Sequence, residues 1–141
     1  MTETIIEYWV DRIDELLDGQ LGADGGVVPA EMAEEYDELD PRVFVAASVD
    51  SSERNNKRVI DSVRVRVGID ATKPFVREEG PKALYELKRV VADELERHRK
   101  PWKADGVGSD TIVQWDGDLE RYLCAVEATG EFRRFHAAYE D

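Results

Sequence analysis

The sequence predicts an α+β fold, a two-layer sandwich in which an antiparallel sheet of about four to five strands carries two helices on one face. The main observation is the stretch 59–70, where Val63, Val65, Val67 and Ile69 occupy every second position and arginines lie between them. Successive side chains of a strand point to opposite faces, so one face is aliphatic and the other is charged. Two amphipathic helical segments elsewhere in the chain can cover the aliphatic face.

The length and composition predict one α+β domain that spans residues 1–141 around a single core, because 42% of its 141 residues are apolar. No apolar run approaches the ~20 residues of a membrane span, so we expect no membrane partner. The N-terminus has acidic residues where a signal peptide has positive charge, and we expect it to belong to the mature protein. A single cysteine, Cys124, excludes an internal disulfide.

The charge is strongly negative and unevenly distributed. The net charge is −13, and residues 1–41 carry 13 Asp and Glu against the single basic residue Arg12. The remaining hundred residues are nearly balanced. This acidity argues against non-specific DNA binding, and we expect no sequence-specific nucleic acid partner either. Abundant carboxylates, with more Arg than Lys, are typical of halophilic proteins, although an ordinary acidic protein is an equal alternative.

The first helix is predicted over residues 4–18. Its apolar residues recur at helical spacing: Ile5, Ile6, Trp9, Ile13, Leu16 and Leu17. Thr4 and Glu7 fit a capping box at its start, and Gly19 suits its C-terminal end. A long acidic loop is expected at about residues 19–42, in which a proline can start a helical turn or two.

A β-hairpin is predicted next. Its first strand spans residues 43–49, and the polar connector 50–58 joins it to the strand 59–70, so the two strands should be antiparallel neighbours. Asn55-Asn56 near the middle of the connector suits a turn. Exposed loop tips often carry binding residues, and this tip holds the densest basic cluster of the chain: Arg54, Lys57 and Arg58.

The second helix is predicted over residues 83–100, after a loop at 71–80, with Pro81 in its first turn and Pro101 at its end. Its buried stripe is expected to consist of Leu84, Leu87, Val91 and Leu95, and the helical spacing allows the stripe to extend to His98. Trp102 should fold back onto the core.

The remaining chain is predicted to add strands to the sheet. After a loop at 103–110, strands are expected at 111–115 and 122–129, with turns at 116–118 and 129–130. The last segment, 132–139, is ambiguous between strand and helix, and its alternation favours strand.

No catalytic signature is present, and we expect no catalytic, cofactor-binding or metal-binding residues and no cofactor. The two histidines, His98 and His136, and Cys124 lack the spacing of a zinc site. Residues 116–120 superficially resemble a calcium loop but lack its twelve-residue ligand pattern. Neither a nucleophile elbow nor a phosphate-binding glycine motif occurs. A hydrolase or nuclease is kept as a third alternative, because catalytic carboxylates are hard to recognise in so acidic a chain.

The order of elements resembles that of the tail terminators and related head–tail joining proteins of long-tailed bacterial and archaeal viruses. The elements concerned are a helix (IIEYWVDRIDELL), an acidic connection, a hairpin with VRVRVGI, a second helix (ALYELKRVVADEL) and closing strands that include YLCAVEAT. The resemblance implies a non-enzymatic structural virion protein that forms a ring, commonly a hexamer. Such a ring caps the tail tube and joins it to the head connector.

The implied partners are further copies of the chain, the tail tube protein and the head–tail connector or stopper protein. The implied location is the neck of a virion that is assembled in the host cytoplasm, and the composition would make the host a haloarchaeon. The runner-up is a small acidic cytoplasmic α+β binding or regulatory protein that is dimeric through its sheet.

The candidate subunit interface follows from the charge asymmetry. The acidic first 41 residues are complementary to cations of the hairpin, and rings are built from contacts between unlike surfaces. The candidate residues are Arg54, Lys57, Arg58, Arg64 and Arg66. Solvation, or pairing within one subunit, is the alternative role for these side chains.

Overall fold

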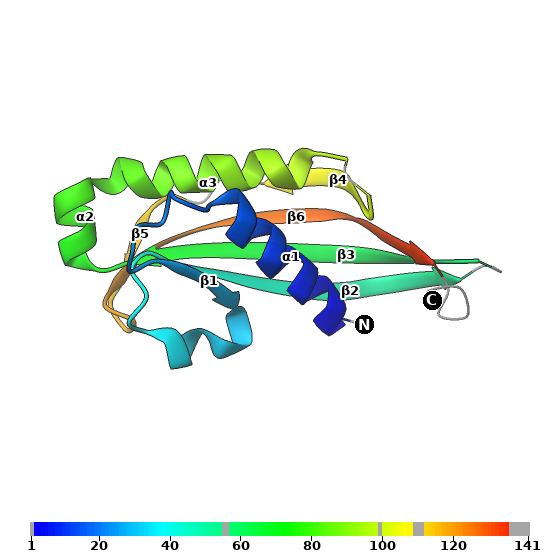
Figure 1. The fold of residues 1–141 in the computed structure, drawn as a ribbon, viewed down its shortest axis with the longest axis horizontal. Coiled ribbons are helices and arrows are strands. Elements are labelled where there is room, and N and C mark those ends of the chain that lie inside the picture. Colours follow the sequence, from blue (N-terminus) through cyan, green and yellow to red (C-terminus); the bar gives the residue numbers. More distant parts are fainter. Residues whose placement is uncertain (1, 55–56, 99, 109–111, 136–141) are drawn as a thin grey trace.

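A six-stranded, mostly antiparallel sheet runs the length of the protein, and its long helices pack on one face (Figure 1). The computed structural model describes residues 2–54, 57–98, 100–108 and 112–135. The predicted α+β class is confirmed.

The elements follow one another along the chain as α1 (Thr2–Leu16), β1 (Gly26–Pro29), the 3-10 helix η1 (Ala30–Tyr36), β2 (Arg42–Arg54), β3 (Arg58–Ala71), α2 (Lys73–Glu79), α3 (Pro81–Glu96), β4 (Trp102–Gly108), β5 (Gln114–Asp116) and β6 (Arg121–Phe135). The strand order is β1-β2-β3-β6-β4, and β5 also pairs with β6. Among the strands of the described residues, only β1 pairs in parallel, with β2. The predicted antiparallel hairpin of β2 and β3 is confirmed.

The core lies between the helices and the aliphatic face of β3, as predicted. Val63, Val65, Val67 and Ile69 are all buried. The helical residues predicted to lie opposite them are buried as well: Ile13, Leu17, Leu84, Leu87, Val91 and Leu95. Burial of each such aliphatic side chain contributes roughly 1.5–3 kcal/mol, so this layer dominates the stability of the fold.

Trp102 returns to the core, which confirms that prediction. Its indole Nε1 donates a hydrogen bond to the backbone oxygen of Leu95 at 2.8 Å, and its ring meets Trp9 edge to face at 5.2 Å. Arg12 joins the two long helices, because its Nη2 lies 3.0 and 3.1 Å from the two carboxylate oxygens of the buried Glu94.

The N-terminal half differs from the prediction in two respects. The helix α1 begins at Thr2, so Thr4 lies inside it and the capping box is wrong. The segment expected to be a long loop contains β1 and η1. A four-residue parallel strand is too short to show alternation, which explains why β1 was missed. Pro29 does begin a helical turn. The helix α1 ends at Leu16, before the predicted end at residue 18, and Gly19 lies in the turn that follows, with φ of +81°.

The region around the second helix also needs correction. The loop expected at 71–80 contains α2, in which Thr72 caps the N-terminus and Pro74 lies in the first turn. The helix α3 ends at Glu96, before Pro101. His98 therefore lies beyond the helix and is exposed, so its place in the buried stripe was wrong.

The C-terminal strands are longer than predicted. The expected loop at 103–110 contains most of β4. In place of the strand predicted at 111–115, the described residues show the shorter β5, Gln114–Asp116. The turn predicted at 129–130 is absent because β6 continues through it. Position 130 requires a glycine, because a Cβ atom there would lie 2.5 Å from the Trp102 ring. The predicted final strand is confirmed as far as Phe135, and residues 136–141 lie outside the described part of the chain.

Candidate subunit interface

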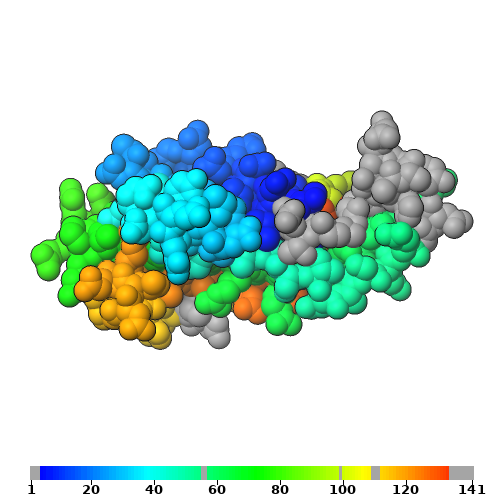
Figure 2. Space-filling model, turned by 90° about the horizontal axis from the view of Figure 1, so that it is seen from below, coloured from blue at the N-terminus to red at the C-terminus, as the bar shows by residue number. Residues whose placement is uncertain are grey.

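We call the face of the sheet opposite the helices the outer face. Arg64 and Arg66 lie on it, and their side chains are 53% and 49% exposed. Figure 2 shows α1 in blue along one side of the sheet, while green and orange side chains of β3 and β6 project on the other. The middle of the outer face therefore presents charged side chains to solvent.

These two arginines belong to a balanced strip of charge. Arg64 lies 3.7 Å from Asp50 and 3.9 Å from Glu127, and Arg66 lies 3.7 Å from the second carboxylate oxygen of Glu127. Such long, exposed pairs contribute roughly 0–1 kcal/mol each. Glu127 of β6 lies directly opposite Arg66, so both arginines have partners within the subunit, which was the alternative role expected for them. The arginines can therefore exchange these partners for others.

The hairpin tip lies far from that strip. Arg54 ends β2, Lys57 lies in the turn, and Arg58 begins β3; all three are exposed. Arg64 lies six positions after Arg58 along the strand, which is about 20 Å. The structure therefore divides the five candidate residues into a tip group and a mid-strand group.

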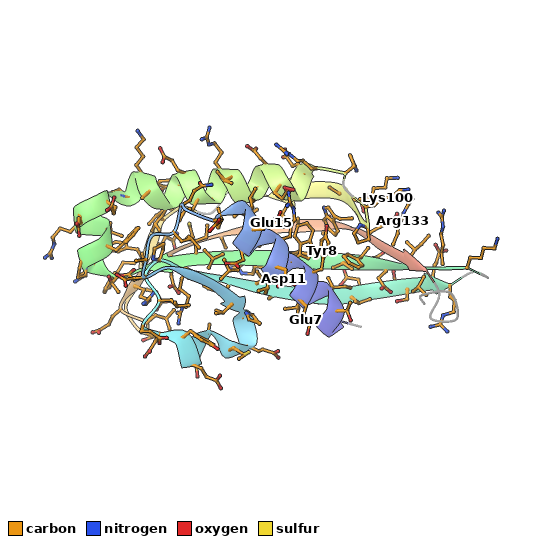
Figure 3. The ribbon with its side chains drawn as sticks, viewed as in Figure 1. Glu7, Tyr8, Asp11, Glu15, Lys100 and Arg133 are labelled. Atoms are coloured by element: carbon orange, nitrogen blue, oxygen red, sulfur yellow. The ribbon has the colours of Figure 1, made fainter. Side chains whose placement is uncertain are left out.

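Other cations gather beside the tip, on segments distant in sequence. The backbone N–H of Arg133 donates to the oxygen of Pro101 at 2.8 Å, and Lys103 lies opposite Glu131 in the register of β4 and β6. Glu131 is paired with Arg133, whose Nη2 lies 2.7 Å from its carboxylate. Figure 3 labels Lys100 and Arg133 near this end of the molecule. We define the basic end as the described cations of this region: Arg54, Lys57, Arg58, Arg97, Lys100, Lys103 and Arg133. Sequence reasoning assigned only the first three to the interface. Lys103 and Arg133 reach this end through sheet pairing, and Arg97 and Lys100 lie between α3 and β4.

Exposed carboxylates gather at the opposite end of the sheet. The register of β3 and β6 pairs Ala71 with Tyr122 at this end and Arg58 with Phe135 at the other. We define the acidic end as the exposed carboxylates of η1, of the residues after it and of the β5–β6 turn: Glu31, Glu34, Glu35, Asp37, Glu38, Asp118 and Glu120. The β5–β6 turn thus lies a strand length from the hairpin tip. The helix η1 begins closer to the middle of the sheet, because Pro29 pairs with Val45 and Val45 pairs with Val67 of β3.

A buried ionic cluster fixes the acidic end. Asp70 is fully buried between two arginines, at 2.7 Å from Arg42 and 2.6 Å from Arg121. Arg121 also donates to the backbone oxygens of Asp37 and Leu39, at 2.7 and 2.8 Å. The guanidinium groups therefore hold the acidic segment against the sheet. No sequence pattern indicated this cluster, because alternation places Asp70 on the outer face, where it would be exposed if η1 did not cover it.

An open hollow of about 360 Å³ lies on the outer face near the acidic end. It is lined by Arg66, Ile112, Gln114, Trp115, Asp116, Gly117, Leu123, Cys124 and Ala125. Three large apolar side chains in and beside this region are unusually exposed: Ile112 at 59%, Leu119 at 48% and Trp115 at 40%. Exposed apolar residues that are grouped in this way are typical of interaction sites.

The side chains around the hollow are well ordered by their neighbours. The ammonium group of Lys73 lies 4.5 Å from the centre of the Trp115 ring, a cation–π contact. Asp116 Oδ1 accepts the backbone N–H groups of Asp118 and Leu119 at 3.0 and 3.1 Å. This hydrogen bonding accounts for the turn that superficially resembles a calcium loop.

Metal binding and thiol chemistry depend on the His, Cys, Asp and Glu side chains of the described residues. No group of three or more His, Cys, Asp or Glu side chains among them is placed to hold a metal ion. Cys124 is buried, and this burial raises the pKa of its thiol to about 11, so the thiol stays protonated at neutral pH. His136 lies outside the described residues.

No protein-family model matches the chain, and no curated protein matches it. No helix in the described part of the chain is long and apolar enough to cross a membrane. The fold and surface thus define an α+β protein with two oppositely charged ends and an open outer sheet face.

Proposed function

We propose that this protein is a structural subunit of a virus particle, a ring-forming tail terminator that caps the tail tube and joins it to the head connector. The ring is built from copies of the chain, commonly six, and its other partners are the tail tube protein and the connector or stopper protein. The subunits assemble in the host cytoplasm and end in the neck of the virion.

The observation that carries this proposal is the separation of unlike surfaces on one subunit. A ring needs a contact in which one surface of a subunit meets a different surface of the next. The basic end, the acidic end and the open outer face supply such unlike surfaces. The order of elements that supports the viral resemblance is also present: a helix, an acidic connection, the β2–β3 hairpin, a helix and closing strands.

The acidic surface supports a halophilic host as part of the same proposal. Eleven acidic residues among the first 41 are exposed, and their mutual repulsion should destabilise the fold at low ionic strength. We expect the melting temperature to rise as potassium chloride increases from millimolar to molar concentrations, because salt screens this repulsion. The measurement is thermal unfolding followed by circular dichroism.

A variant with fewer carboxylates distinguishes the screening of charge repulsion from other effects of salt on stability. Glu7, Asp11 and Glu15 form one exposed row on α1 (Figure 3), and replacing them by Gln, Asn and Gln removes three charges without changing shape. The rise in melting temperature should be smaller in this variant. A flat or falling melting temperature in the unaltered protein would rule out the halophilic interpretation.

The outer face provides the direct test of the ring. We expect the double substitution Arg64→Glu and Arg66→Glu to leave the subunit folded, because both side chains are half exposed and only weakly paired. If the mid-strand arginines themselves face acidic residues of the neighbouring copy, the reversed charges should block assembly, because like charges would then meet in the contact. Sedimentation velocity would then show monomers instead of rings.

A matched control reverses two exposed arginines elsewhere, with Arg77→Glu and Arg89→Glu on α2 and α3. This variant has the same change in net charge and should still assemble. An intact ring in the Arg64/Arg66 variant would show that the outer face makes no subunit contact. A dimer in the unaltered protein would instead support the alternative, a small acidic binding or regulatory protein that associates through its sheet.

A further inference from the structure

We propose that the subunits join head to tail, with the basic end of one copy bound to the acidic end and the adjoining hollow of the next copy. This inference rests on the proposed ring and identifies the two surfaces that form its contact. It adds the acidic end and the Trp115 region as the receiving surface, which sequence reasoning did not identify.

The positions of the two ends favour this contact over a two-fold symmetric one. Residue Arg58 lies at one end of the β3–β6 ladder and Ala71 lies at the other. A contact between opposite ends is heterologous, so each subunit keeps one free end for the next subunit. Repeated addition then closes into a ring when the angle between subunits allows it.

Charge complementarity identifies the partner as another copy of the chain. The basic end has seven exposed or partly exposed cations in a protein of net charge −13, and the acidic end has seven exposed carboxylates. Complementary charges of this kind guide encounter and fix orientation, while they disfavour contact between two like ends. Arginine is well suited to this role because its guanidinium group binds carboxylates with two parallel hydrogen bonds.

The apolar residues around the hollow give the contact a component that strong salt does not screen. Ile112, Trp115 and Leu119 are 40–59% exposed in the subunit. Covering them removes apolar surface from water, and this gain persists at ionic strengths where exposed ion pairs are screened. The Trp115 ring already attracts Lys73, so it can also accept a guanidinium group from the neighbouring hairpin tip.

The acidic row on α1 lacks this second component. Figure 3 shows Glu7, Asp11 and Glu15 along the helix, and the nearby aromatic residue Tyr8 is used within the subunit. Its ring lies 5.1 Å from Trp9 and 5.2 Å from Phe132. We therefore assign the contact to the acidic end and use the α1 row as its control.

The test is a pair of charge-reversed variants, studied alone and mixed. The tip variant carries Arg54→Glu, Lys57→Glu and Arg58→Glu, and the acidic-end variant carries Glu35→Lys, Asp118→Lys and Glu120→Lys. Each alone opposes like charges and should sediment as a monomer with an unchanged circular dichroism spectrum. An equimolar mixture should reassemble, because each variant then presents an end that complements the other.

Trp115 reports whether the hollow is covered. Trp9 and Trp102 are 1% and 2% exposed, whereas Trp115 is 40% exposed. Iodide quenching of tryptophan fluorescence should therefore fall on assembly of the unaltered protein. It should not fall in the tip variant, and the change should disappear in a Trp115→Phe variant that still assembles.

The control variant, with Glu7→Lys, Asp11→Lys and Glu15→Lys, should assemble like the unaltered protein. The head-to-tail contact is overturned if the tip variant still forms rings, if mixing fails to restore assembly, or if the α1 control alone blocks it. In those cases the ring itself stands when the unaltered protein assembles. A monomer at all protein and salt concentrations in the unaltered protein would instead overturn the proposed ring as well.

Discussion

The substitution Val65→Asp is expected to prevent folding. Val65 is fully buried at the centre of the sheet, between Ala47 of β2 and Ala128 of β6, and faces the helices. A carboxylate there would lose its hydration without gaining a partner, which costs several kcal/mol. Because small domains are stable by only about 5–15 kcal/mol, this cost consumes much or all of the stability. Circular dichroism and thermal unfolding of the variant measure the loss.

A carboxylate on the opposite face is the matched control. Ser48 lies on β2 beside Arg64 and is exposed, so Ser48→Asp should change the melting temperature little. A soluble Val65→Asp protein with unchanged melting would show that the two faces of β3 are wrongly assigned. An equal loss in both variants would show that a negative charge on the sheet is harmful irrespective of its face.

The second large effect is expected for Asp70→Asn. This change keeps the shape of the side chain but leaves the buried guanidinium groups of Arg42 and Arg121 without their carboxylate. Breaking a buried ion pair by removal of one partner costs roughly 3–5 kcal/mol, because the remaining charge stays buried. The same arginines hold the backbone of the acidic segment, so this segment should lose its position as well.

The free energy of unfolding, from urea denaturation, measures the first part of this effect, and hydrogen exchange of residues 33–40 measures the second. Glu127→Gln is the control, since it removes a carboxylate that pairs with two arginines at 3.7–3.9 Å on the exposed face. The control should cost no more than about 1 kcal/mol. Similar losses for the two variants would show that the burial of Asp70 is unimportant.

Much of the fold could be predicted because its central elements are strongly periodic. The alternation along β3 identified both the sheet and its buried face, and the spacing in α1 and α3 identified the helices that cover it. Short elements with no periodicity were missed, namely β1, α2 and β4. Gly130 was interpreted as part of a turn. The residue is a glycine because Trp102 approaches its backbone closely.

The candidate site could be predicted only in part. The tip cations were visible because they are close in sequence, and the exposure of Arg64 and Arg66 followed from alternation. The rest of the basic end, the Asp70 cluster and the hollow near Trp115 depend on side chains brought together from distant segments. The strand register brings these residues together, and the pattern of one sequence does not reveal that register.

The mass of the assembled protein distinguishes a closed ring from a monomer or a dimer. We expect sedimentation velocity in molar potassium chloride to detect a closed particle well above a dimer, and electron microscopy of the same sample to show rings. A particle no larger than a dimer at every protein and salt concentration would contradict the claim that this chain is a ring-forming neck protein.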